Sequence, residues 1–221
     1  MKHIITTVSL LLLSMSATSV FAQDDKFDTR EKFEVGVKAG INVSNVYDEK
    51  GDNFVADSKA GFAGGVYLSI PFNKYIGIQP EVLFSQKGFQ STRTYAGGAF
   101  FNDYTVKYST VTNHIDIPLQ LQIKPAGFIT FVVGPQYSFV LSKVDKREDS
   151  SGNSNADTTN YNNDNIRKNI LGVVGGVDFN IFHFVLSGRA GWDLQNNNGD
   201  GSSSNPRYKN AWYQLTVGAK F

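Results

Sequence analysis

The stretch that decides the fold begins at Phe33 and reads Phe33-Glu-Val-Gly-Val-Lys-Ala-Gly-Ile-Asn-Val-Ser44. Its odd-numbered residues are all apolar, and the even-numbered residues between them are polar or glycine. This period of two is typical of a β-strand, because successive side chains of a strand point to opposite faces. One face of this strand is therefore apolar and the other is not.

Seven further segments show the same alternation, and they lie at residues 62–70, 76–84, 115–123, 129–139, 171–179, 184–194 and 213–221. The connections between segments alternate in length. Residues 71–74, 124–127 and 180–183 are short turns, whereas residues 46–58, 91–103, 144–167 and 196–209 are long, polar loops. The pattern predicts an all-β fold, an eight-stranded antiparallel up-and-down transmembrane β-barrel with short periplasmic turns and long extracellular loops.

The first 22 residues are predicted to be a secretory signal peptide. Lys2 supplies the positive charge, an apolar run follows from Val8 to Leu13, and Val20-Phe-Ala22 has the small-x-small form of a cleavage site. A membrane anchor is the alternative, but this run is well short of the roughly 20 residues that span a bilayer. We expect residues 23–32 to be a periplasmic segment and residues 33–221 to be the barrel domain.

Composition excludes several classes of protein. The chain of 221 residues has no cysteine, which rules out disulfide scaffolds and thiolate metal sites. Its 21 Lys and Arg residues oppose 20 Asp and Glu residues, and removal of Lys2 leaves a net charge of zero. Totals of this kind give no support to nucleic-acid binding.

The polar face of the strands is predicted to fill the lumen, because eight strands leave room only for side chains. The ionisable residues on this face are Glu34, Lys38, Glu81, His114, Asp116, Asp178, Arg189, Asp193 and Lys220. Counted from the periplasmic turns, Arg189 reaches the height of Glu81 and Asp116 and is expected to bridge them. Lys220 and Glu34 are expected to be neighbours where the barrel closes. We interpret the set as a structural plug of ion pairs, with a proton or ion path as the alternative.

Catalytic and metal-binding candidates are few. His114 and Asp116 share a face, and Ser138 would complete a hydrolytic set, but a structural luminal histidine is the favoured interpretation. The oxygen-rich stretches 149–157 and 196–200 lack the residue order of a calcium loop. We therefore expect no enzyme activity, no metal site and no cofactor.

Four motifs, taken in order, resemble the PorT-like outer-membrane β-barrel family of Gram-negative bacteria. They are Val35-Gly-Val-Lys-Ala-Gly-Ile-Asn42, Gln79-Pro-Glu-Val-Leu-Phe-Ser-Gln-Lys-Gly88, His114-Ile-Asp-Ile-Pro-Leu-Gln-Leu121 and Val217-Gly-Ala-Lys-Phe221. The resemblance covers essentially the whole mature chain and implies an eight-stranded barrel in the cell outer membrane. Some relatives are linked to protein secretion, a role that the motifs do not transfer, and no catalytic residues belong to the pattern.

The C-terminal strand ends in an aromatic residue and carries apolar side chains at every second position. This ending resembles the signal that the barrel assembly machinery reads in outer-membrane proteins. The residues assigned to it are Tyr213, Leu215, Val217 and Phe221.

Three functional classes follow from these observations. The favoured one is a structural or recognition barrel, embedded in outer-membrane lipid, whose loops contact an external protein or glycan. Its contact candidates are aromatic residues in polar loops, namely Tyr47, Phe54, Tyr95, Phe100, Phe101, Tyr104 and Tyr161. A narrow small-solute channel is the second class. The third is a soluble lipocalin-like carrier, in which the apolar face would point inward and bind an apolar ligand.

Overall fold

The computed structural model describes residues 29–50, 56–95, 104–149, 154–160, 167–197 and 207–221. The described residues form a short 3-10 turn, Thr29–Glu31, followed by one antiparallel sheet of nine strands. The strands are β1 (Glu34–Lys50), β2 (Asp57–Pro71), β3 (Ile76–Tyr95), β4 (Tyr104–Ala126), β5 (Ile129–Asp149), β6 (Ser154–Asn160), β7 (Asn169–Ile181), β8 (Phe184–Asp193) and β9 (Arg207–Lys220). None of the described helical residues forms a segment long and apolar enough to cross a membrane.

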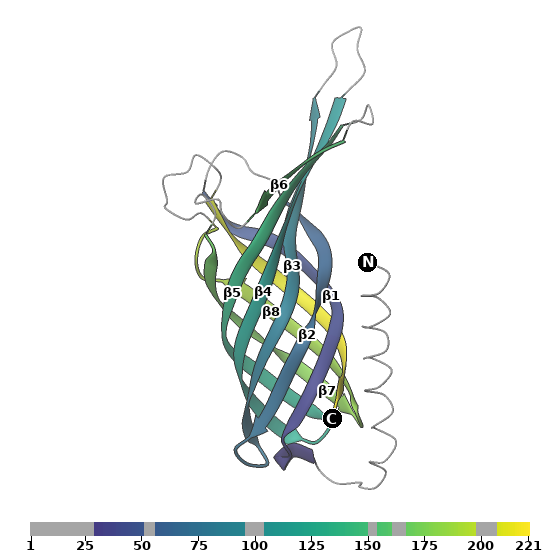
Figure 1. Ribbon diagram of the computed structural model, residues 1–221, viewed down its shortest axis with the longest axis vertical. Helices are drawn as coiled ribbons and strands as arrows, with labels where there is room; N and C mark the ends of the chain where they lie inside the picture. The colour runs from purple at the N-terminus through teal and green to yellow at the C-terminus, as the bar shows by residue number, and fades with distance from the viewer. Residues whose placement is uncertain (1–28, 51–55, 96–103, 150–153, 161–166, 198–206) are drawn as a thin grey trace.

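Eight of these strands close into a barrel, and β6 lies outside the ring. Each barrel strand pairs with its neighbours in sequence, except that β5 pairs with β7 and β1 pairs with β9. Figure 1 shows the short turns and the C-terminus together at one end of the barrel. The backbones of Val35 and Phe221 exchange two hydrogen bonds, of 3.1 and 2.8 Å, so the seam is paired up to the last residue. The predicted up-and-down barrel is confirmed.

The two faces of the barrel wall are inverted relative to a soluble protein. Val37 on the outer face is 38% exposed, whereas its neighbour Lys38 is only 4% exposed. Aliphatic and aromatic side chains cover the outside of all eight barrel strands, and amides, hydroxyls and charges fill the inside. This arrangement contradicts the lipocalin-like alternative, which requires the apolar face to point inward.

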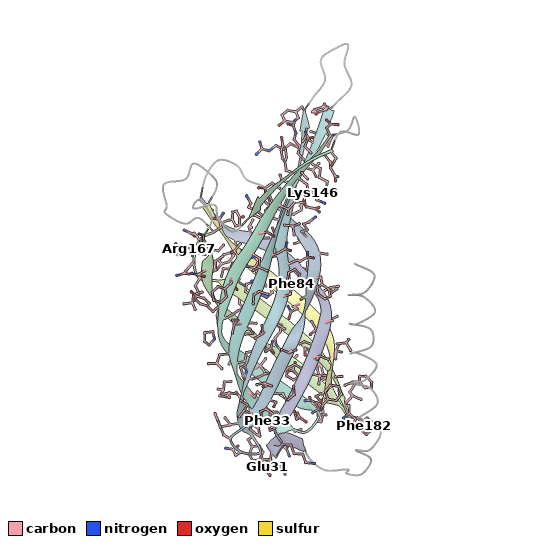
Figure 2. The ribbon with its side chains drawn as sticks, viewed as in Figure 1. Glu31, Phe33, Phe84, Lys146, Arg167 and Phe182 are labelled. Atoms are coloured by element: carbon pink, nitrogen blue, oxygen red, sulfur yellow. The ribbon has the colours of Figure 1, made fainter. Side chains whose placement is uncertain are left out.

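The outer apolar band has a boundary at each end. Exposed aromatic residues mark the short-turn end, and they are Phe33, Phe72, Tyr75, Phe128, Phe182, Phe184 and Phe221. Figure 2 labels Phe33 and Phe182 at this end. At the other end, Gln86 donates to Asn113 and Asn113 donates to Ser142 across three neighbouring strands. An apolar band with an aromatic girdle, ending at a polar belt, is typical of a barrel wall in lipid.

Strands β3, β4 and β5 continue beyond the barrel, and with β6 they form a sheet that projects above the other strands (Figure 1). The predicted loop boundaries are therefore wrong. Residues 91–95 belong to β3, residues 144–149 to β5 and residues 154–160 to β6, while β1, β2 and β9 extend into the loops 46–58 and 196–209. The described side chains of residues 91–95, 144–149 and 154–156 are exposed or half-buried, so the apolar alternation that signals a strand is absent there.

Candidate functional site

The lower lumen contains a buried layer of four charges contributed by four strands. Lys38 of β1 pairs with Glu81 of β3, with 2.6 Å between Nζ and Oε2. Arg189 of β8 pairs with Asp178 of β7 at 2.7 Å and approaches Glu81 at 3.7 Å. All four residues are at most 5% exposed. Each charge therefore has an opposite charge beside it, which offsets part of the cost of removing it from water.

A second charged layer surrounds Lys87. Its ammonium lies 3.2 Å from Asp116, 3.4 Å from the hydroxyl of Ser138 and 3.8 Å from the centroid of the Trp212 ring. The expected bridge from Arg189 to Asp116 is wrong. Arg189 pairs instead with Asp178, because Asp178 lies on the adjacent strand only one diagonal step away, whereas Asp116 belongs to the separate layer around Lys87.

The sequence prediction missed Lys87, Trp212 and Tyr67, all of which are buried. Continuing the β3 alternation beyond Phe84 would have placed Lys87 on the lumen side. Trp212 and Tyr67 occupy polar positions of the pattern, but aromatic residues on that face give no signal of their own.

The luminal charges balance. Five cations (Lys38, Lys87, Lys124, Arg189, Lys220) are buried with four acids (Glu81, Asp116, Asp178, Asp193), and the fifth acid, Glu34, is half-buried. Lys220 and Glu34 pair at 3.0 Å across the seam between β9 and β1. Asp193 accepts a hydrogen bond of 2.7 Å from Asn210. Among the described residues, the lumen thus has no excess of either sign with which to select an ion.

His114 is 1% exposed, and neither imidazole nitrogen has a hydrogen-bond partner. Ser138 instead accepts hydrogen bonds from Lys87 and Gln136, so Ser138 and His114 do not form the nucleophile and base of a hydrolytic set. Within the described ranges, no group of three or more acidic or histidine side chains has the geometry of a metal site.

The extracellular end of the lumen is capped by apolar side chains. Val46, Phe89 and Tyr208 are buried together, and the rings of Phe89 and Tyr208 meet edge to face with centroids 5.1 Å apart. From this cap downward, the inward positions are filled by the two charged layers and the amides between them.

Three of the aromatic contact candidates lie on strands rather than in loops, which corrects their predicted location. Tyr47 is in β1 and donates its hydroxyl to the backbone of Asp193, while Tyr95 and Tyr104 are directly opposite each other in β3 and β4. Phe54, Phe100, Phe101 and Tyr161 lie outside the described residues. The assembly candidates Tyr213, Leu215, Val217 and Phe221 are outward-facing and between 51% and 68% exposed.

One face of the projecting sheet gathers tyrosine and arginine side chains, which we call the Tyr–Arg face. Directly paired residues share a face of a sheet, and this register places Arg93, Tyr95, Tyr104, Tyr108 and Arg147 on one side. The Arg147 guanidinium lies 5.9 Å from the Tyr108 ring centroid, and the Tyr95 and Tyr104 centroids are 6.4 Å apart. The Tyr104 hydroxyl donates to Asp149 at 3.2 Å. Arg93, Tyr95, Tyr108 and Arg147 are exposed.

An inverted barrel with an apolar outer band, a lumen of paired charges and a projecting sheet defines an integral outer-membrane β-barrel protein. Residues 21–199 match the family model of the outer membrane protein β-barrel domain, and the chain belongs to that family. It is a protein of the cell outer membrane, with its apolar band embedded in lipid.

Several solved structures are similar to this chain, and none of the curated proteins matches it. Ail, the attachment invasion locus protein of Yersinia pestis, is 14% identical with a TM-score of 0.48, over 85% of this chain and 98% of that chain. Neisserial surface protein A is 11% identical with a TM-score of 0.40, over 86% and 97%. OprG of Pseudomonas aeruginosa is 12% identical with a TM-score of 0.39, over 89% and 99%.

Proposed function

We propose that this protein is a recognition barrel whose Tyr–Arg face binds an external acidic glycan. The observation that carries the proposal is the position of exposed tyrosine and arginine side chains on a regular sheet that projects beyond the apolar band. Tyrosine and arginine are the residues most enriched where binding energy is concentrated. A sheet holds them in fixed register, which reduces the entropy lost on binding.

The chemistry of the face favours a ligand with carboxylate or sulfate groups. The guanidinium group forms paired hydrogen bonds with planar anions. Arg93 of β3 is opposite Val106 of β4, and Arg147 of β5 is opposite Tyr108, so the two arginines flank β4 at positions two residues apart along it. Two acids of the same face are engaged, since Asp149 accepts from Tyr104 and Asp145 pairs with Lys143 at 2.9 Å. The tyrosine rings offer flat apolar surfaces to the sugar rings.

The test measures binding of the purified barrel, in lipid nanodiscs, to immobilised heparin as a sulfated probe. We expect Arg93→Gln combined with Arg147→Gln to weaken binding by about tenfold or more, because each charge-assisted hydrogen bond contributes about 1.5–3 kcal/mol. Lys107→Gln is the matched control. Lys107 is exposed on the same projecting strand β4, opposite Thr92 and Glu148 on the other face. Equal losses in the control and the double variant would reduce the interaction to general charge attraction and contradict the proposal, as would full affinity for an uncharged polysaccharide.

We also propose the finer assignments that the sequence supports. The order of the four motifs favours the PorT-like subfamily, and the composition of residues 1–22 favours a signal peptide followed by the periplasmic segment 23–32. The outward, exposed positions of Tyr213, Leu215, Val217 and Phe221 favour their recognition by the barrel assembly machinery. The paired charges of the lumen favour a structural plug and no catalytic role.

A further inference from the structure

The residues before β1 make an unusual contact at the periplasmic end of the barrel. Arg30 precedes β1 by only four positions, yet its guanidinium donates to the backbone oxygens of Lys124 and Pro125, at 3.3 and 3.2 Å. These two residues lie in the last turnward positions of β4, just before its end at Ala126, and β4 is three strands away from β1 around the ring. To reach them, the Thr29–Glu31 turn has to cross the periplasmic mouth.

Lys124 returns the contact to Arg30, and residues of β2 and of the β2–β3 turn also take part. The Lys124 ammonium donates to the backbone oxygen of Arg30 at 3.3 Å and to the hydroxyl of Ser69 at 3.1 Å. The Arg30 guanidinium also lies 5.5 Å from the ring centroid of Tyr75, in the turn between β2 and β3. Arg30 is therefore held from two sides, by carbonyl oxygens and by an aromatic face.

Behind Arg30 lies a polar cavity of about 20 Å³. Its lining includes Tyr67, Ser69, Gln122, Thr130 and Asn180, and the hydroxyl of Tyr67 is buried without a hydrogen-bond partner. A cavity of this size has room for roughly one or two water molecules, and a polar lining keeps such a space hydrated. Ser69, Gln122 and Thr130 are at most 5% exposed, whereas Arg30 and Asn180 are half-buried, so the cavity is deep within the mouth but remains partly open at its rim.

We propose that the Thr29–Glu31 turn is a lid, latched by Arg30, over an aqueous vestibule in the periplasmic mouth of the barrel. The lid covers part of the periplasmic opening of the vestibule, and the charged layer of Lys38, Glu81, Asp178 and Arg189 closes the vestibule from above. Release of the Arg30 side chain loosens the lid without disturbing the strands, because that side chain contacts backbone oxygens at the end of β4 and the ring of a turn residue, while the Lys124 hydrogen bond to the Arg30 carbonyl remains. This device lies at the end of the barrel opposite to the Tyr–Arg face and is independent of the proposed glycan binding.

The test uses thiol labelling, for which the absence of cysteine from the chain gives a clean background. Thr130→Cys places a thiol in the vestibule at a residue whose hydroxyl accepts from Asn180 and takes no part in the latch. Thr216→Cys is the matched control, because Thr216 is equally buried in the lumen but does not line the vestibule. Each thiol is introduced with Arg30 intact and with Arg30→Ala, and the rate of reaction with a small charged methanethiosulfonate is measured in folded, detergent-solubilised barrels.

We expect Thr130→Cys to react about tenfold faster or more when Arg30 is replaced, as for a local opening, and Thr216→Cys to stay slow in both backgrounds. The proposal is overturned if the Thr130→Cys rate does not depend on Arg30. It is also overturned if both thiols accelerate equally, because that result means a loosened barrel. If Arg30→Ala does not fold, Tyr75→Leu replaces it, removing only the ring beneath the guanidinium, and a several-fold acceleration at Thr130→Cys alone is then expected.

Discussion

The barrel wall and the projecting sheet are built from the same strands, yet their sequences differ completely. Within the apolar band, β4 alternates outward Ile115, Ile117 and Leu119 with buried residues that are polar except for Pro118. Above the band the same strand carries Thr105 and Lys107 on one side and tyrosines on the other. Its pairing with β3 and β5 nevertheless continues, with one register shift against β5 between Asn113 and His114. The comparison teaches that period-two apolarity reports the surrounding solvent, whereas the strand itself depends on the hydrogen-bond ladder.

Ion pairs differ between the two regions in the same way. Lys38 and Glu81 have side chains 1% exposed, whereas the side chains of Lys143 and Asp145, where the sheet leaves the barrel, are 25% and 45% exposed. The distances are similar, at 2.6 and 2.9 Å. Burial, and not geometry, should therefore decide what each pair contributes to stability.

The largest effect is expected for Glu81→Ala. The substitution leaves Lys38 without its partner and removes one of the two acids near Arg189, so uncompensated charge stays buried in the lumen. Breaking a buried pair in this way costs about 3–5 kcal/mol of unfolding free energy. Urea unfolding in lipid vesicles measures the change. If Glu81→Ala lost less unfolding free energy than a variant that breaks the exposed Lys143–Asp145 pair, the result would mean that water screens the charges of the lumen.

Val37→Arg is expected to have the next largest effect. Val37 lies on the outer face within the apolar band, and an arginine near the middle of the bilayer costs roughly 2–4 kcal/mol of barrel stability. Thr105→Arg on the projecting sheet is the control and should change stability by less than about 0.5 kcal/mol. The comparison of the two regions breaks down if the two substitutions have equal cost, or if Lys38→Val is the more damaging change.

A smaller effect on stability, with a larger effect in cells, is expected for Phe221→Ala. Its ring is 53% exposed, and its backbone hydrogen bonds to Val35 remain after truncation. Lost area burial costs at most about 1–2 kcal/mol. If Phe221 is read during assembly, the amount of inserted protein in the outer membrane falls sharply, while the variant refolded into detergent unfolds close to wild type. Normal abundance, or a refolded stability low enough to explain the loss, contradicts the assembly role.

The smallest effect is expected for Lys143→Gln. The variant removes the exposed ion pair with Asp145 but leaves no buried charge, and pairs of this kind contribute about 0.2–1 kcal/mol. Unfolding of this variant and of Glu81→Ala in the same vesicles compares the two regions directly. A loss of several kcal/mol would show that the base of the projecting sheet is as important to stability as the lumen.

Much of the barrel is predictable from sequence because lipid imposes a two-sided pattern. The eight segments and the inward positions of Lys38, Glu81 and Arg189 follow from alternation, and so do the short connections, although residues 124–126 belong to β4 and not to the predicted turn 124–127. The strand extensions and β6 do not, since polar residues such as Ser, Thr and Asn look the same in a strand as in a loop. This is why the sequence predicts a loop at Tyr95 and Tyr104, although the two residues form a cross-strand pair.

The sequence also does not predict which luminal charges form ion pairs with one another. Counting residues from the turns places Arg189 level with both Glu81 and Asp116, but side chains meet according to strand stagger and position around the ring. Arg189 therefore pairs with Asp178 on the next strand, and Asp116 pairs with Lys87. The Arg30 latch is equally invisible in sequence, because it joins residues 94 positions apart through backbone oxygens.

The inverted barrel wall, on which the whole account depends, is tested most directly by the chain's two tryptophans. Trp192 faces outward and is 42% exposed, whereas Trp212 lies at nearly the same height but inside, 2% exposed and over Lys87. The measurement is fluorescence quenching by lipids brominated in their acyl chains, on Trp212→Phe and Trp192→Phe variants that each keep one tryptophan. The account predicts strong quenching of Trp192 and little quenching of Trp212. The reverse result would place the polar face in lipid and contradict the account.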